Sequence, residues 1–244
     1  MPATTLVQLM TIMITVMQLS ILVPMLVVWR RRREFPPSVK LLSWYVYLSA
    51  FCALGVRLIV PNDNSLFLIG FNLGKIVLFA TVYYGMVESA RMRQLVLITT
   101  LVALVVCIGL TGSGFFIHSF DLAVVVSRVM QSAVLAAFAL VYLEQMLGPS
   151  NKTPLLRDPI WLLSVGQLLY SAGTVTAFSL DYLSETRYDQ APKYMMVAVI
   201  GIIFNVFLTL AFLRAKTAPQ RPVGNNAPPV NQFAQNSHRS SSVY

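Results

Sequence analysis

Seven long apolar segments restrict the fold of this chain more than any other feature. Their approximate limits are 5–29, 41–60, 66–87, 94–116, 122–147, 159–182 and 194–214. A helix of about 20 apolar residues spans the roughly 30 Å hydrocarbon core of a bilayer. Backbone polar groups in lipid must be satisfied within helices or closed barrels, and these segments lack the short alternating pattern of barrel strands. They predict an all-α polytopic membrane protein, a seven-transmembrane-helix bundle over residues 1–214.

The composition agrees with this interpretation. The chain is 57% hydrophobic and 11% charged, whereas soluble domains are about half apolar and about a quarter charged. The two cysteines fall inside apolar segments and are interpreted as small buried side chains. Residues 215–244 are rich in Pro, Asn, Gln and Ser. We expect them to be a disordered tail, because they cannot bury enough apolar surface to offset the entropy of ordering.

The distribution of Lys and Arg predicts an orientation. Thirteen of the 18 lie in the first, third and fifth connections and in the tail, and two lie in the sixth connection. Positively charged loops stay on the cytoplasmic side, so we expect the N-terminus outside and the C-terminus in the cytoplasm. The first segment ends at Arg30–Arg33 and has no charge before it, which is unlike a signal peptide. Pro24 is expected to kink this segment.

Three cations lie inside the apolar segments, namely Arg57, Lys75 and Arg128. A charge at the centre of a bilayer costs roughly 2.5–3.5 kcal/mol on insertion scales, so each of these residues needs a physical reason to be there. With the N-terminus outside, all three fall in the outer half of the predicted bundle. None has a carboxylate at a matching depth on its own helix.

Several polar side chains share helix faces with these cations, and polar stripes on membrane helices normally face the bundle interior. We therefore expect a polar, net positive cavity that opens toward the outside and holds an anionic or polar small ligand. The alternative is that these side chains only bond the helices together, while the cations extend to lipid headgroups or to aspartates at the rim. The candidate ligand-binding residues are Lys75, Arg128, Arg57, Asn72, Gln131, Gln167, Tyr170, Thr174, Asp181 and Asn205.

Motifs for catalysis or cofactor binding are missing from the sequence. It has two histidines, no HExxH zinc motif and no glycine-rich phosphate loop, and such motifs carry metal or nucleotide chemistry. The segment 194–214 contains no lysine for a retinal Schiff base. We expect no enzymatic activity, no metal and no cofactor. The net charge of +9 is attributed to membrane orientation, not to nucleic-acid binding.

The segment "LLRDPIWLLSVGQLLYSAGTVTAFSLDYL" (155–183), with Asn205 in the last segment, resembles a family of small, uncharacterised seven-helix bacterial membrane proteins. The shared features are Asp158-Pro159, Trp161 and the run from Gly166 to Tyr170. The similarity covers most of residues 20–213. The family usually carries an acidic residue at the position of Lys75, and often another at that of Gln131, so the chain departs from the family at both. Related modules form the membrane input regions of histidine kinases. The resemblance implies a sensing role in a bacterial cytoplasmic membrane.

Three functions remain open from the sequence. The first is a sensor or signalling module that relays ligand binding to a separate cytoplasmic partner. The second is a transporter of small solutes or anions, which would need a polar path that continues into the cytoplasmic half. The third is a structural membrane protein without a ligand. The lipid bilayer is an expected partner in each case, nucleic acid is not, and Gly70 and Gly74 form a GxxxG motif that could pack within the bundle or in a homodimer.

Overall fold

The computed structural model describes residues 3–58, 65–87, 89–117, 121–147, 158–183 and 191–215. This part of the chain is helical and contains no strand, which confirms the predicted all-α class. The expected tail, 215–244, lies outside the described residues except for Ala215. The helices are α1 (Ala3–Ser20), α2 (Leu22–Arg31), a short 3-10 turn η1 (Arg32–Glu34), α3 (Pro37–Leu58), α4 (Ser65–Met86), α5 (Ala90–Ile117), α6 (Asp121–Leu147), α7 (Pro159–Leu183) and α8 (Ala191–Arg214).

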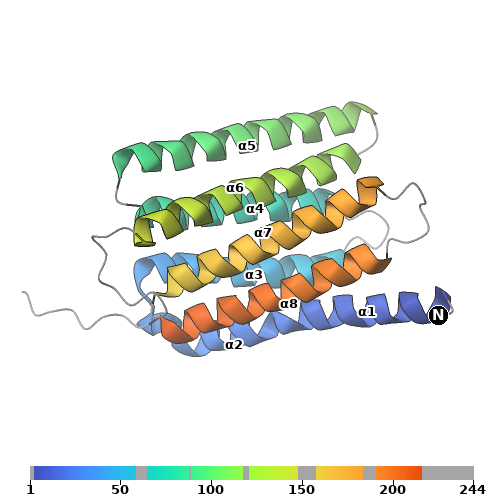
Figure 1. The fold of residues 1–244 in the computed structure, drawn as a ribbon, viewed down its shortest axis with the longest axis horizontal. Coiled ribbons are helices and arrows are strands. Elements are labelled where there is room, and N and C mark those ends of the chain that lie inside the picture. Colours follow the sequence, from blue (N-terminus) through green and yellow to red (C-terminus); the bar gives the residue numbers. More distant parts are fainter. Residues whose placement is uncertain are drawn as a thin grey trace, which may run out of the picture.

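The helices lie side by side along one common direction (Figure 1). Helix α7 packs between α6 and α8, and α4 packs between α3 and α6. Helices α1 and α2 pack against α8, while α5 lies at one edge against α4 and α6. Interior positions are therefore supplied mainly by α3, α4, α6, α7 and α8.

Six helical segments are long and apolar enough to cross a membrane, counted over the described residues. The molecule therefore has the character of a multi-pass membrane protein. The remaining apolar segment of the sequence forms α3, which is not among the six, so the seventh span stays a prediction. The six segments are Thr5–Glu34, Ser65–Met86, Ala90–Gly114, Ala123–Leu147, Pro159–Ala177 and Lys193–Arg214.

Pro24 marks the break in the first span. Helix α1 ends at Ser20 and α2 begins at Leu22. Proline has no N–H, so the Ser20 carbonyl loses the donor that would come four residues later. The backbone at Ile21 stays near helical values, with φ −67° and ψ −20°. The first span therefore continues in the same direction across the expected irregularity at Pro24.

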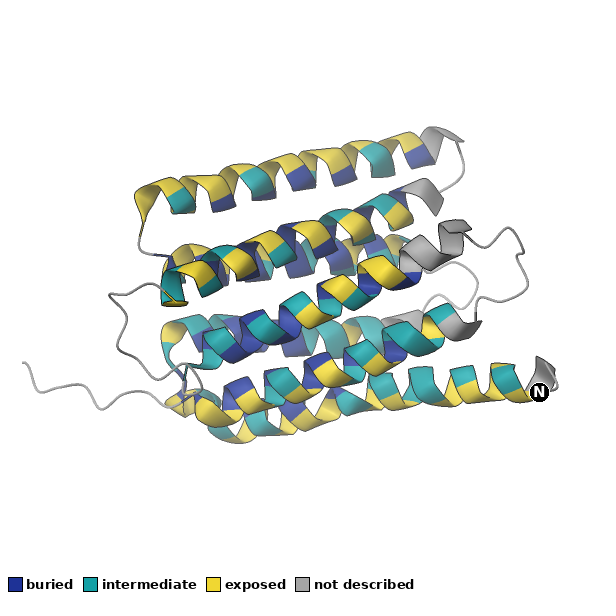
Figure 2. Ribbon diagram, viewed as in Figure 1, coloured by how far each residue is buried: buried dark blue, intermediate teal, exposed yellow. Residues whose placement is uncertain are grey.

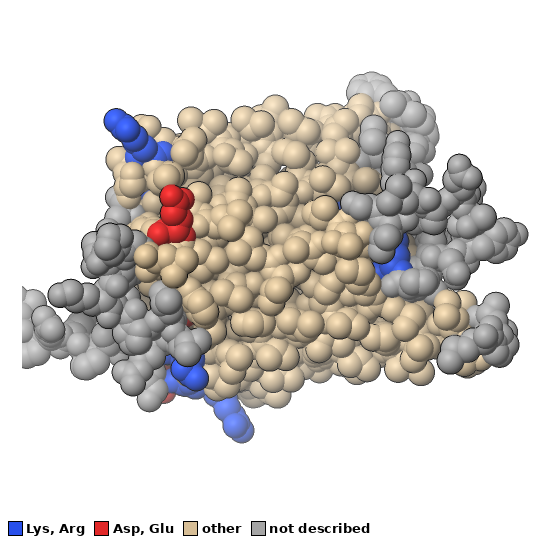
Figure 3. Space-filling view, in the orientation of Figure 1, with Lys and Arg blue, Asp and Glu red and all other residues tan. Residues whose placement is uncertain are grey.

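Charged side chains gather at the two ends of the visible face and leave its middle uncharged (Figure 3). Outward-facing helix surfaces carry exposed residues, most clearly along α5 (Figure 2). Those exposed residues include Leu101, Val105 and Ile108, as expected for a surface in contact with lipid. We call one end of the bundle the basic end, because it carries eight described Lys and Arg residues: Arg30, Arg31, Arg32, Arg33, Lys40, Arg91, Arg93 and Arg214.

Helices α7 and α8 approach each other closely at two glycines of α7. A Cβ added at Gly166 would lie 2.6 Å from the Cβ of Phe207, and one at Gly173 would collide with Ile200. Gly74 of the GxxxG motif packs against Leu48 of α3, where an added Cβ would meet a Leu48 methyl at 2.8 Å. Gly70 has nothing within 4 Å. Of the two glycines in this motif, Gly74 alone allows a close contact between helices of the bundle.

We predict that Gly166→Ala lowers the thermal unfolding temperature in detergent, because overpacking a tight contact costs roughly 1–3 kcal/mol. Gly70→Ala is the matched control. Its new methyl meets no neighbour, and alanine is favoured over glycine in helices by about 1 kcal/mol. Equal unfolding temperatures for the two variants would contradict the close α7–α8 approach.

Candidate functional site

Lys75 lies in the core of the bundle and is 1% exposed. Its ammonium nitrogen lies 4.2 Å from the centre of the Tyr170 ring and 4.8 Å from that of Phe204. The centres of the Tyr45 and Phe79 rings lie 5.4 and 5.6 Å away. We call these four rings, Tyr45, Phe79, Tyr170 and Phe204, the aromatic cage. Within the described part of the chain, Lys75 makes no ion pair and no side-chain hydrogen bond.

The cage brings together four helices, α3, α4, α7 and α8. Its rings also contact one another: Tyr45 packs edge-to-face on Phe79 at 5.3 Å and on Phe204 at 6.0 Å, and Tyr170 lies 5.4 Å from Phe204. A desolvated cation–π contact contributes up to about 2 kcal/mol. Several such contacts are comparable to the roughly 2.5–3.5 kcal/mol cost of a charge in the membrane interior. The rings therefore provide the physical reason for a lysine at this position.

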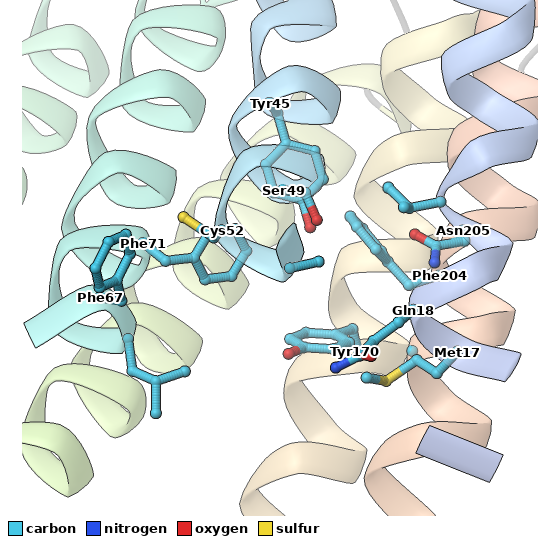
Figure 4. Close-up of a pocket in the computed structure, with 14 residues that line it drawn as sticks. Met17, Gln18, Tyr45, Ser49, Cys52, Phe67, Phe71, Tyr170, Phe204 and Asn205 are labelled. Atoms are coloured by element: carbon cyan, nitrogen blue, oxygen red, sulfur yellow. The ribbon is translucent and has the colours of Figure 1, made fainter. Parts of the chain in front are cut away.

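A cavity of about 290 Å³ lies beside the cage, between α1, α3, α4, α7 and α8. Figure 4 shows side chains from these helices surrounding it. Tyr45, Tyr170 and Phe204 belong both to the cage and to the cavity wall, whereas Lys75 does not line the cavity. The cavity is near the lower limit of volumes typical of small-molecule sites. Its lining is mostly apolar, with polar groups from Gln18, Ser49, Cys52 and Asn205 and from the two tyrosines.

Two of the candidate residues bond neighbouring helices. Asn72 of α4 donates to the hydroxyl of Ser127 on α6 at 3.0 Å. Asn205 of α8 donates to Ser20 of α1 at 2.7 Å and also lines the cavity. Both hydrogen bonds are of the kind that the alternative interpretation of the sequence expects. Of these two residues, Asn205 both bonds a neighbouring helix and lines the cavity.

Three buried polar atoms have no hydrogen-bond partner within the described part of the chain: Gln131 Nε2, Ser132 Oγ and Gln167 Oε1. Gln131 and Gln167 are 2% and 0% exposed. The other amide atom of Gln167, Nε2, donates to Ser171 at 3.0 Å. Buried polar groups are normally paired with protein or with an ordered water. A water molecule or a polar group of a ligand could therefore form hydrogen bonds with these atoms of α6 and α7.

The register of the helices places Gln131 at nearly the same level of the bundle as Lys75. Asn72 pairs with Ser127, and Tyr83 packs on Phe138 at 6.1 Å, so α4 and α6 run in the same direction with a constant offset. That offset brings Gln131 level with Ile76, the residue after Lys75. The contact of Lys75 with Tyr170 and the hydrogen bond of Tyr83 to Ser164 set α7 antiparallel to α4.

The remaining candidate residues are Arg128, Thr174, Arg57 and Asp181. Arg128 is half-buried and lies within electrostatic range of Tyr170. Thr174 is buried and donates to the Tyr170 carbonyl at 2.6 Å, a bond within its own helix. The side chains of Arg57 and Asp181 lie outside the described residues. The structure thus brings Lys75, Tyr170 and Arg128 together, and their binding of a ligand stays a prediction.

Buried polar contacts continue toward the basic end, which the sequence analysis did not anticipate. The hydroxyls of Tyr83 and Ser164 hydrogen-bond at 2.9 Å between α4 and α7. Further along, Tyr142 of α6 donates to Asp158, whose other carboxylate oxygen accepts the backbone N–H of Ile160 at 2.8 Å. Asp158 therefore caps the start of α7 and ties it to α6.

Tyr45, Phe79 and Phe204 of the cage were not among the residues predicted from the sequence. Phe79 could have been found, because it lies one turn after Lys75 on the same face of α4. Tyr45 and Phe204 come from α3 and α8, and nothing in their local sequence connects them with Lys75.

Comparison of the chain with protein-family models, with curated proteins and with solved structures finds no match.

We predict a favourable coupling between Lys75 and Tyr170 in a double-mutant cycle of Lys75→Met and Tyr170→Leu. The free energy of unfolding should show a coupling of about 1 kcal/mol or more, the size of a desolvated cation–π contact. Tyr170→Phe is the control, because it keeps the ring and should preserve most of the coupling. A cycle with no coupling would contradict the role of the cage.

Proposed function

We propose that this chain is an integral membrane sensor-type module. A small ligand with a polar or anionic group binds in the 290 Å³ cavity, and the bundle relays its presence to a separate cytoplasmic partner. The observation that carries the proposal is the double role of Tyr45, Tyr170 and Phe204, which line the cavity and hold the Lys75 ammonium. A ligand that displaces these rings would change the environment of a buried charge.

The proposed orientation places the basic end in the cytoplasm. Of the Lys and Arg residues at the two ends of the described helices, eight lie at the basic end, whereas Arg57 and Lys193 belong to the opposite ends of α3 and α8. The rule that cytoplasmic loops are rich in Lys and Arg supports this orientation. The N-terminus would then be outside, the proposed membrane is a bacterial cytoplasmic membrane, and a partner would contact the basic end.

Helix α7 is the proposed relay. It carries Tyr170 in the cavity wall, and Asp158 lies immediately before its first residue at the basic end. Between them, Ser164 bonds α7 to α4 through Tyr83. Packed helices move as rigid elements by about 1–2 Å in many switching proteins. A shift of α7 at the cavity would therefore reach Asp158 and its contact with Tyr142.

A second candidate is a transporter of small solutes or anions, favoured by one observation. The buried contact of Tyr83 with Ser164 and the partly buried contact of Tyr142 with Asp158 extend the polar residues from the level of Lys75 toward the basic end. A transporter requires such a path.

The relay is tested by the distance between spin labels at positions 40 and 144, two exposed sites at the basic end on α3 and α6. The background is Cys52→Ala with Cys107→Ala. We expect Tyr170→Ala to shift this distance by about 1–2 Å, as in other helix switches. Leu169→Ala is the control, because Leu169 is 48% exposed and faces away from the cavity. If Tyr170→Ala leaves the distance as unchanged as the control does, the relay is wrong.

The transporter is tested with the full chain in proteoliposomes and radiolabelled acetate or chloride. Uptake above that of empty liposomes, lost in Lys75→Met and Arg128→Gln, would favour transport over sensing. Uptake equal to that of empty liposomes, or indifferent to both substitutions, would contradict it.

A further inference from the structure

An apolar groove runs along the surface between α2 and α3 and shares no lining residue with the cavity. Its volume is about 540 Å³, and it is lined by Leu22, Met25, Leu26 and Trp29 of α2 and by Tyr47 of α3. The four α2 residues follow the spacing of one helix face. Leu22, Leu26 and Trp29 are 47%, 56% and 78% exposed. In a membrane-spanning bundle this groove faces lipid.

Next to the groove lies an arginine that contacts two aromatic rings. Arg32 comes three residues after Trp29, directly after α2, and begins the 3-10 turn η1. The Arg32 guanidinium lies 4.7 Å from the ring centre of Trp44 and 5.5 Å from that of Tyr47. Tyr47 thus both lines the groove and contacts Arg32. Arg32 makes no ion pair among the described residues.

The neighbouring arginines add positive charge that the described part of the chain does not neutralise. Arg31 is occupied, since it pairs with Glu34 at 3.2 Å and donates to the Leu213 carbonyl at 2.8 Å. Arg30 and Arg33 are exposed and have neither a hydrogen bond nor an ion pair with a described residue. Three guanidinium groups, those of Arg30, Arg32 and Arg33, therefore have no acidic partner among the described residues, and all three follow directly after Trp29 of the groove.

We propose that this groove and its arginines bind one anionic phospholipid, with an acyl chain along Leu22, Met25, Leu26 and Trp29 and the phosphate at Arg32 and Arg33. Arginine matches the geometry of phosphate oxygens. Trp29, Trp44 and Tyr47 suit the interfacial depth at which a headgroup joins its chains. Clusters of Lys and Arg next to a membrane helix attract anionic lipids. In the protein the apolar groove lies next to the arginines, just as in a phospholipid the acyl chain lies next to the phosphate.

A simpler interpretation is that the arginines only orient the first span, as positively charged loops generally do. Orientation requires charge alone, in any arrangement. Lipid binding requires in addition an open groove and a guanidinium held at its end. The two interpretations therefore differ in what they expect when charge and groove are changed separately.

The experiment uses the full chain purified in detergent, with phosphatidylglycerol or phosphatidylcholine of the same acyl chains added, and native mass spectrometry to measure the retained lipid. We expect Arg32→Gln with Arg33→Gln to lower phosphatidylglycerol retention roughly thirtyfold, from about 1 kcal/mol for each of the two cations near an anionic lipid. Phosphatidylcholine retention should change little. The control is Arg91→Gln with Arg93→Gln, which removes the same charge from the same end of the bundle.

A second variant, Leu26→Trp, fills the groove and leaves all charges in place. It should also lower phosphatidylglycerol retention, whereas Leu101→Trp on the exposed face of α5 should not. If the arginine variant does not fold, Arg32→Lys replaces it, because it keeps the charge and loses the planar group stacked on Trp44. Equal losses in the two arginine pairs, or full retention in Leu26→Trp, would overturn the proposal. This site does not depend on the proposed sensing function.

Discussion

The contact of one buried ammonium with four aromatic rings is the interaction on which the rest of this core depends. Lys75 is fully enclosed and has no acidic partner among the described residues. A cation in such a place needs a negative surface on several sides, and ring faces provide one without adding a charge. Because the rings come from α3, α4, α7 and α8, these four helices must meet at one level of the bundle.

The same constraint explains why a cavity lies beside the lysine. Rings of the cage face the ammonium on one side and present their other surfaces to the cavity. Aromatic side chains from α3, α4, α7 and α8 line this space, with Met17 and Gln18 of α1. Tyr45, Tyr170 and Phe204 separate Lys75 from that space. A ligand in the cavity would therefore meet an apolar wall with a positive field behind it. This arrangement differs from the open, net positive cavity that the sequence suggested.

The apolar segments predicted the helices well, because the length needed to cross a bilayer and the loss of backbone hydrogen bonds in lipid leave few other solutions. The segment 66–87, for example, corresponds to α4 at Ser65–Met86. Lys75 could be recognised as unusual from its cost in lipid, and Asn72 as its companion on one face. The cage could not be predicted, because Tyr45 and Phe204 are ordinary aromatic residues of apolar helices until the packing of α3 and α8 is known. Register between helices decides such contacts, and single helices do not encode it.

Helix α7 differs from the other spans in how its polar residues are used. Gln167 and Ser171 bond each other, Ser164 bonds across to α4, and Asp158 caps its start while it accepts from Tyr142. Two glycines bring its opposite side against α8. A helix held by directional bonds on one side and by close backbone contact on the other has few intermediate positions, because both kinds of contact are lost over short distances. These contacts favour discrete positions of α7 over a gradual tilt, and α7 is one of the helices that run from the cavity wall to the basic end.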